Sequence, residues 1–497
     1  MKNSGMDNRF RFATIKNRDK EARFTNRRVG YFRDAMSRFL KNKGSLAAGV
    51  VILFLLLFSV ITPFATRYNA VDSDIYYSNC LPKIFNDNGA FFDGTERRTI
   101  GEAEYYLYKE AGKIRETYQK YKTGDGFSGF STKYEARVDT YVIGAVHHTF
   151  TKEELARVLE YDKKASKEYK VMLPLIDTSW IKTEKQEERM AENIIRSNAN
   201  YDYRFNSRTK LPIFKDGKTQ KTWKKDAKGN YVYYETTGLS KNVYNVRLNY
   251  DNYYYSIHRF RPAFGLGSDQ NGRDILTRLA IGGRNSLIFA LCVSVINFVI
   301  GLIYGAIEGF YGENVDIVMG RIAEILGYIP LIVVIALLKS YSGIYFNISA
   351  PVMLFIAFMM TGWLGTASLV RMQFYRYKNQ EYILASRTLG TSDKRLIFRH
   401  ILPNSIGTIV TSSILMIPGV IFAESSLSYL GIIDFDASGG SSIGTMLAQG
   451  QSTYTTYPNN ILWPALFISA LMICFNLFGN GLRDAFNPQL RGSEYAK

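Results

Sequence analysis

The chain has 497 residues, a formal net charge of +18 and a slightly negative mean hydropathy. Three cysteines without a CxxC pair exclude a disulfide framework, and four histidines without a nearby carboxylate cluster argue against a metal site. The average hydropathy is that of a soluble protein, but the apolar residues are clumped into long runs. These runs decide the class of protein.

Six runs are long enough to cross a bilayer, which takes roughly 20 apolar residues. Four carry no charge, at residues 45–64, 286–307, 349–370 and 461–482. Two carry charge: residues 317–338 contain Arg321 and Glu324, and residues 405–430 contain Glu424. The first run is too long for a cleaved signal peptide and follows a long basic tail, so it is a retained span. The sequence predicts an α-helical polytopic membrane protein with six transmembrane helices.

The runs divide the chain into five parts. A basic tail and the first span are followed by a long insertion, a five-span membrane domain and a short C-terminal tail. Their boundaries are residues 1–44, 45–65, 66–263, 264–484 and 485–497. Residues 371–404 form a loop inside the membrane domain, hereafter the basic loop.

The Lys and Arg residues predict the topology. Residues 1–43 contain thirteen basic and four acidic residues, and residues 371–403 contain seven and two. Short basic segments beside spans stay on the cytoplasmic side. Both termini and the basic loop are therefore expected in the cytoplasm, and residues 66–266 outside. The charge serves topology and anionic lipid contact, and no aromatic platform suggests nucleic acid.

The insertion is too long to be structureless. Thr151 and Glu154 have capping-box spacing at the start of an amphipathic helix that we expect to end at Pro174. Turn signals at Asp216-Gly217 and Gly229-Asn230 separate strands rich in Tyr and Val. The sequence predicts an extracytoplasmic α+β domain. Its tyrosines are expected to fill a half-exposed sheet, with a ligand-stacking surface as the alternative.

The basic loop contains the stretch EYILASRTLGTSDKRLIFRHILPN, residues 381–404. Helical spacing precedes Gly390, which breaks the helix, and Thr391 or Ser392 can cap a second one. Pro403 is expected where the chain turns back to the membrane. The pattern predicts two short helices at an angle that fit a groove on another protein.

This stretch resembles the coupling loop of ATP-binding-cassette (ABC) importer permeases. The matching residues are Ala385, Ser386, Gly390, Leu402 and Pro403, with Glu381 one turn earlier. The sequence departs from the general signature at Leu384, Ser386 and His400. Serine keeps the requirement for a small residue, and the departures at Leu384 and His400 resemble the peptide-importer branch. Further segments resemble the C-type permease of oligopeptide, dipeptide and nickel importers: residues 266–287, 362–371, 425–432, 443–450 and 479–491. The insertion has no counterpart in the resemblance.

The resemblance implies the partners: a second homologous permease subunit, two ATPase subunits, an extracytoplasmic solute-binding protein and a peptide or small-solute substrate. No GxxxxGK[ST] phosphate loop is present, so ATP and Mg²⁺ are expected in the partner ATPases, and no catalytic residue, cofactor or metal in this chain. The residues expected to couple to the ATPase are Glu381, Ala385, Ser386, Leu389, Gly390, Arg399, Leu402 and Pro403.

Alternatives remain at this point. The substrate could be nickel or another small solute, or the chain could be a secondary transporter with a large outer binding domain, although no inverted repeat is visible. Arg321 and Glu324 are expected to form a structural pair near the cytoplasmic end of their span. Glu424 fits a pathway-lining and a structural role equally. For the insertion, our hypothesis is that it helps to orient the solute-binding protein.

Overall fold

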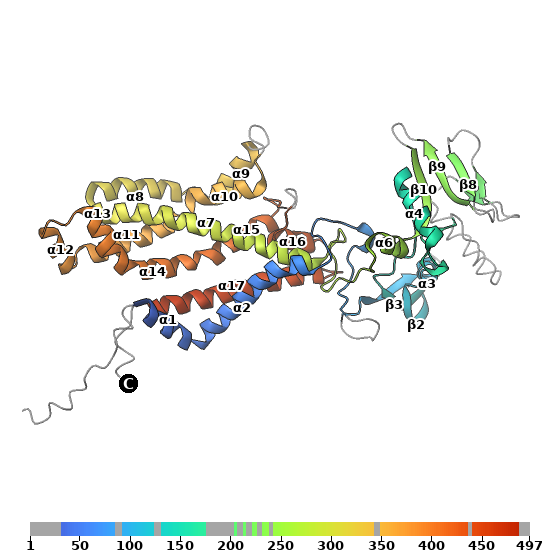
Figure 1. The fold of residues 1–497 in the computed structure, drawn as a ribbon, viewed down its shortest axis with the longest axis horizontal. Helices are drawn as coiled ribbons and strands as arrows, with labels where there is room; N and C mark the ends of the chain where they lie inside the picture. Colours follow the sequence, from blue (N-terminus) through green and yellow to red (C-terminus); the bar gives the residue numbers. More distant parts are fainter. Residues whose placement is uncertain are drawn as a thin grey trace, which may run out of the picture.

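The structure is a computed structural model that describes residues 31–84, 92–123, 131–174, 203–205, 212–214, 221–225, 231–237, 242–341, 348–435 and 440–486. It consists of a helical bundle with the insertion projecting from one end (Figure 1). Helix α12 and the short helix α1 lie toward the opposite end (Figure 1). We call the two ends the insertion end and the loop end. The predicted turns at Asp216-Gly217 and Gly229-Asn230 lie outside the described residues.

The bundle is built from long apolar helices. Their bounds are α1 Tyr31–Lys41, α2 Lys43–Ala65, α7 Ile275–Tyr311, α8 Glu313–Gly327, α9 Leu331–Tyr341, α10 Ala350–Thr361, α11 Leu364–Lys378, α14 Leu402–Ile414, α15 Met416–Tyr429, α16 Ile443–Gln451 and α17 Asn459–Phe486. Within the residues that the structure describes, five continuous segments are long and apolar enough to cross a membrane, and the pair α8–α9 would make a sixth. All six coincide with the predicted apolar runs.

The third predicted span, residues 317–338, is not one continuous helix. Helices α8 and α9 are bent by 69° at the break between Gly327 and Leu331. Pro330 stands in this break; proline lacks the N–H donor, and the residue before it is disfavoured in helical geometry. The third predicted span is therefore a bent pair of helices.

Helix α7 lies at the centre of the bundle and packs closely on α11. Gly301, Gly305 and Gly309 follow each other at four-residue steps along one face of α7. A Cβ atom at Gly305 would come within 2.2 Å of the Ala367 carbonyl oxygen, so only glycine allows this approach. The close contact makes α7 and α11 a compact unit.

The insertion contains two main antiparallel sheets. One has the order β1-β3-β2 with helix α3, and the other has the order β4-β10-β9-β8 with β5 beside β10. Their bounds are β1 Thr95–Gly101, α3 Glu102–Glu110, β2 Ile114–Thr123, β3 Ser131–Asp139, β4 Ala145–Phe150, β5 Met172–Leu173, β8 Lys221–Lys225, β9 Tyr231–Thr237 and β10 Asn242–Asn249. The short strands β6 Tyr203–Phe205 and β7 Pro212–Phe214 pair separately. The predicted α+β insertion is thus partly seen as strands.

Helices α4 (Lys152–Lys164) and α6 (Tyr250–His258) cover the second sheet, and both correct the sequence analysis in part. The capping box of Thr151 and Glu154 is present at the start of α4. The helix ends at Lys164 rather than at Pro174, because a turn (η4, Lys167–Tyr169) and β5 follow. Residues 250–257 end the stretch that was expected to form strands rich in Tyr and Val, but they lie in α6. Asn249 caps this helix, and Tyr250 and Tyr254 are buried against the sheet.

The insertion is joined to the bundle by more than its two connecting chains. Asn79 donates its backbone N–H to the carbonyl oxygen of Asp269, with an N···O distance of 2.9 Å. Further out, the Arg98 guanidinium donates to the Tyr457 hydroxyl at 2.9 Å. Contacts between residues this far apart in sequence place the β1-β3-β2 sheet against the N-terminal end of α17.

Candidate functional site

The basic loop begins with helix α12, Glu381–Thr388. The helix ends at Gly390, whose φ of +80° is in the left-handed region that favours glycine. The Thr391 N–H then bonds the Ser386 carbonyl oxygen at 3.2 Å, and the Gly390 N–H bonds that of Arg387 at 3.0 Å. Glycine therefore fixes the direction in which the chain leaves α12, as the sequence predicts.

The second half of the loop differs from the prediction. A short helix α13 (Asp393–Arg395) continues through a π-helical turn (η7, Leu396–Ile401) into α14 without a break. Pro403 follows the π-helical turn inside this continuous helix; it removes one N–H donor there but does not turn the chain. The second helix of the loop is thus the start of the fifth span.

Three apolar side chains anchor the loop to the bundle. Ile383, Leu396 and Ile401 are almost fully buried. They pack with residues of α7, α11 and α14, namely Phe310, Val370, Phe374 and Ile409. In addition, the Arg387 guanidinium lies 5.5 Å from the centre of the Phe310 ring. Helix α12 is therefore packed directly against α7 and α11.

The other face of the loop is open. Leu389 is 86% exposed and Phe398 is 61% exposed, while Tyr382 and Leu384 are nearly half exposed. Of the predicted coupling residues, Glu381, Ala385, Leu389, Gly390, Arg399 and Pro403 are exposed, and Ser386 and Leu402 are half-buried. Phe398 and Tyr382 were missed by the sequence analysis, which followed the basic residues and the signature positions. Their aromatic character in a basic loop was the available signal.

An ion-pair network adjoins the loop and was also missed. Arg371, at the end of a segment singled out in the sequence, pairs through Nη2 with Asp316 at 2.7 Å and through Nε with Glu308 at 3.4 Å. These residues lie on α11, α8 and α7 respectively, so the network joins three helices near the loop end.

The two other charged candidates have different surroundings. Glu424 of α15 is fully buried and accepts hydrogen bonds from the Ser286 hydroxyl of α7 at 2.8 Å and from Ser428 at 3.3 Å. Its carboxylate lies inside the packed bundle of this chain, not on its surface. Arg321 and Glu324 form the expected pair at 2.6 Å, but their side chains are 73% and 55% exposed on α8.

Comparison with known proteins gives the class. Residues 297–492 match the model of the "Binding-protein-dependent transport system inner membrane component", and residues 30–82 match the "N-terminal TM domain of oligopeptide transport permease C". The fold and these matches define a polytopic permease of the ABC transporter class. The chain belongs to this family of inner-membrane transport components. The two family matches leave residues 83–296 between them.

Curated relatives are similar to the chain over less than half of its length. The Bacillus subtilis oligopeptide transport system permease protein OppC is 42% identical over 227 residues, which cover 45% of this chain and 72% of the relative. The B. subtilis dipeptide permease DppC is 39% identical, covering 45% and 68%. Escherichia coli K12 OppC is 38% identical, covering 45% and 72%. A structure of the MetNI methionine ABC transporter in inward-facing conformations covers 42% of this chain and 96% of its own, at 15% identity and a TM-score of 0.33.

Proposed function

We propose that this chain is the permease subunit of an ATP-driven importer of oligopeptides or dipeptides. It acts with a second homologous permease subunit, two ATPase subunits that bind ATP and Mg²⁺, and an extracytoplasmic solute-binding protein. The observation that carries the proposal is the basic loop, with one face buried in the bundle and the other exposing Leu389 and Phe398. Large apolar side chains on an otherwise polar, basic surface are typical of a protein contact.

The loop works as a lever. When the ATPases close around ATP, α12 moves with the ATPase groove that holds it. Ile383, buried against α7 and α11, transmits the movement to those helices. The continuous helix from Asp393 into α14 carries the same movement into the fifth span. A rigid, doubly anchored element transmits displacement better than a mobile loop.

The second permease subunit is proposed to contact α8. No residue of α8 is buried within this chain, and the helix exposes Ile317, Val318, Ile322 and Ile325. An Arg321–Glu324 pair facing lipid in the middle of such a helix would be costly, whereas a protein interface or a water-filled pathway accommodates it. The exposed face of α8 therefore fits the boundary between the two permeases.

The orientation follows from charge. The basic N-terminal tail and the basic loop are proposed to be cytoplasmic, which places the insertion outside. A peptide substrate is favoured by the relatives, whose names are those of oligopeptide and dipeptide permeases. The insertion, at the end opposite to the loop, is proposed to help orient the solute-binding protein.

The coupling proposal is tested with Leu389→Ser in the complete transporter. We expect several-fold less ATPase to co-purify with the permease and uptake to fall in parallel, while the amount of permease in the membrane is unchanged. The matched control is Phe64→Ser, which removes an 81% exposed apolar side chain at the outer end of α2. Normal ATPase association and uptake in Leu389→Ser would contradict the proposal.

A further inference from the structure

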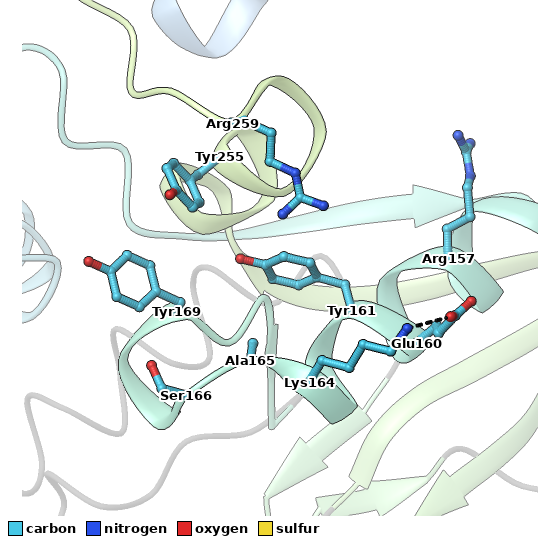
Figure 2. Close-up of a pocket in the computed structure, with 9 residues that line it drawn as sticks. All are labelled: Arg157, Glu160, Tyr161, Lys164, Ala165, Ser166, Tyr169, Tyr255 and Arg259. Carbon is cyan, nitrogen blue, oxygen red and sulfur yellow. Dashed lines mark hydrogen bonds and ion pairs between the residues drawn. The ribbon is translucent and has the colours of Figure 1, made fainter.

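The insertion contains a hollow of about 490 Å³ between α4, the η4 turn and the C-terminal end of α6 (Figure 2). We call it the α4–α6 hollow. Its size is within the range of small-ligand sites, roughly 300–1,000 Å³. Three tyrosines line it, Tyr161, Tyr169 and Tyr255, together with Arg259 near the centre and Arg157 at the rim. No family match covers this part of the chain.

Hydrogen bonds of Asp162 and Asn252 hold the walls of the hollow in place. The Asp162 carboxylate accepts the backbone N–H groups of Val171 and Met172, both at 2.8 Å. From α6, the Asn252 amide donates to the carbonyl oxygens of Glu168 and Lys170, both at 2.9 Å. The turn that carries Tyr169 is therefore tied to both helices, and the site is formed before any ligand arrives.

The groups that face the hollow have unused binding capacity. Within the described part of the chain, neither the Arg259 guanidinium nor the hydroxyls of the three tyrosines make a hydrogen bond. Arg259 lies 5.5 Å from the centre of the Tyr161 ring, and the Tyr169 and Tyr255 rings are 5.7 Å apart. Arg259 also has a φ of +64°, a conformation that is uncommon for a non-glycine residue. An exposed arginine held over a tyrosine ring is arranged to receive a planar anion.

A second hollow in the insertion lacks this property. It has a volume of about 370 Å³ and is lined by Asp139 and Asp251 among others. Asp139 pairs with Arg115 at 2.7 Å, and Asp251 accepts from the Tyr77 hydroxyl and from backbone N–H groups. The carboxylates of Asp139 and Asp251 are thus satisfied by groups of the chain itself.

The charge in the α4–α6 hollow selects the kind of anion. Glu160 is paired with Lys164 at 2.9 Å, which leaves two arginines and no unpaired carboxylate among the lining residues. Both α4 and α6 present their C-terminal ends here, and the partial negative charge of these ends offsets part of the positive charge. This balance suits a single carboxylate better than a polyphosphate.

We propose that the α4–α6 hollow binds an acidic peptide segment. A carboxylate of the segment pairs with the Arg259 guanidinium, its backbone carbonyls accept from the tyrosine hydroxyls, and a neighbouring side chain packs on the tyrosine rings. The segment comes either from a free peptide or from the surface of the extracytoplasmic solute-binding protein. The second source rests on the proposed function, whereas binding itself does not.

The test uses the purified full chain in lipid nanodiscs and a fluorescently labelled Asp- and Glu-rich hexapeptide. We expect saturable binding that Arg259→Gly weakens at least tenfold and Arg157→Gln several-fold. Glycine accepts the positive φ of position 259, so this change removes the guanidinium without straining the fold. The matched control is Lys163→Gln, which removes an exposed charge on α4 outside the hollow and should leave binding unchanged.

Further binding and competition experiments identify the ligand and its source. Equal binding of a Lys-rich hexapeptide, equal affinity in Arg259→Gly, or full displacement by millimolar inorganic phosphate would each overturn the peptide assignment. Displacement of the labelled peptide by the purified solute-binding protein would identify a segment of that protein as the source. Binding without such displacement would identify a free peptide, and it would leave the transport proposal untouched.

Discussion

The backbone N–H of Lys83 donates a hydrogen bond to the carbonyl oxygen of Phe264, with an N···O distance of 2.8 Å. The chain thus enters and leaves the insertion at one point. A few residues away in both segments, the Cys80 N–H donates a hydrogen bond to the Ser268 hydroxyl oxygen at 2.8 Å. Gly272 packs so closely on the Asp74 backbone that a Cβ atom there would clash. These contacts, hereafter the junction, tie residues 74–83 to residues 264–272 at the start of the membrane domain.

The junction allows the insertion to be removed without disturbing the membrane domain. Because residues 83 and 264 are hydrogen-bonded neighbours, replacing residues 85–261 with a short Gly/Ser linker should preserve the membrane domain. We expect a normal amount of assembled transporter with several-fold weaker engagement of the solute-binding protein and lower uptake. Replacing residues 70–260 instead removes Tyr77 and Cys80, and should lower the amount of assembled transporter. Unchanged docking and uptake after the shorter replacement would refute an orienting role for the insertion.

The exposed pair on α8 gives a second prediction. If α8 faces the second permease, a cysteine at Ile325, which is 66% exposed, should form a cross-link to that subunit with a short bifunctional reagent. The control is a cysteine at Leu291, a 53% exposed position on α7. We also expect Arg321→Leu to lower assembly, since it leaves the Glu324 carboxylate without its partner in a desolvated interface. Equal cross-linking from both positions would contradict this interface.

Topology can be measured separately. In a background in which Cys80, Cys292 and Cys474 are replaced by serine, single cysteines are introduced at Lys163 and Lys394, both exposed. An impermeant maleimide should label position 163 in cells with an intact inner membrane and position 394 only after permeabilisation. Labelling of position 394 in intact cells would reverse the proposed orientation.

The sequence predicts those features that depend on local chemistry. Apolar runs locate the membrane helices, the Thr151–Glu154 spacing locates a capping box, and Gly390 marks the end of α12. The bend of the third span also had a local signal in Pro330, but a hydropathy window does not weigh it. Pro403 alone did not distinguish a helix end from a helix that continues, because proline ends many helices but is accommodated inside others, here beside a π-helical turn.

Features that depend on distant residues could not be predicted in this way. The hydrogen bond between Arg98 and Tyr457 joins residues 359 positions apart. Residues 250–258 are rich in tyrosine, which favours strands, but the burial of Tyr250 and Tyr254 against the sheet stabilises a helix. The α4–α6 hollow likewise brings Tyr161 and Tyr255 together only through tertiary packing.

Acidification should destabilise the insertion. Burial, with the positive charge of Arg247 opposite, lowers the pKa of His147 to about 4, and burial also lowers the pKa of His148. The unfolded chain has a histidine pKa of about 6.5, so it binds more protons than the folded chain between these values, and the free energy of unfolding falls as pH falls from 6.5 to 4. Burial raises the pKa values of Asp74 and Asp162, which opposes this effect at the acidic end.

Thermal unfolding of the full chain in nanodiscs, with the 85–261 replacement as baseline, should show a lower melting temperature of the insertion at pH 5 than at pH 7. His147→Gln should reduce this difference, whereas His258→Gln, at an exposed position, should not.

The lever is tested most directly at Gly390. Proline cannot adopt the φ of +80° found there, and it also removes the N–H that bonds the Arg387 carbonyl oxygen. We expect Gly390→Pro to change the direction of the chain after α12 and to abolish ATP-driven uptake, while the subunit still inserts into the membrane.

Alanine would meet no neighbouring atom at this site, so Gly390→Ala carries only the conformational cost of roughly 1–2 kcal/mol and should lower uptake in part. Asparagine adopts left-handed geometry more readily, so Gly390→Asn is the matched control and should retain most uptake. Uptake, measured beside the amount of permease in the membrane, should therefore fall in the order Asn, Ala, Pro. If the proline variant transports normally with ATPase bound, the geometry of the basic loop does not couple ATP hydrolysis to transport.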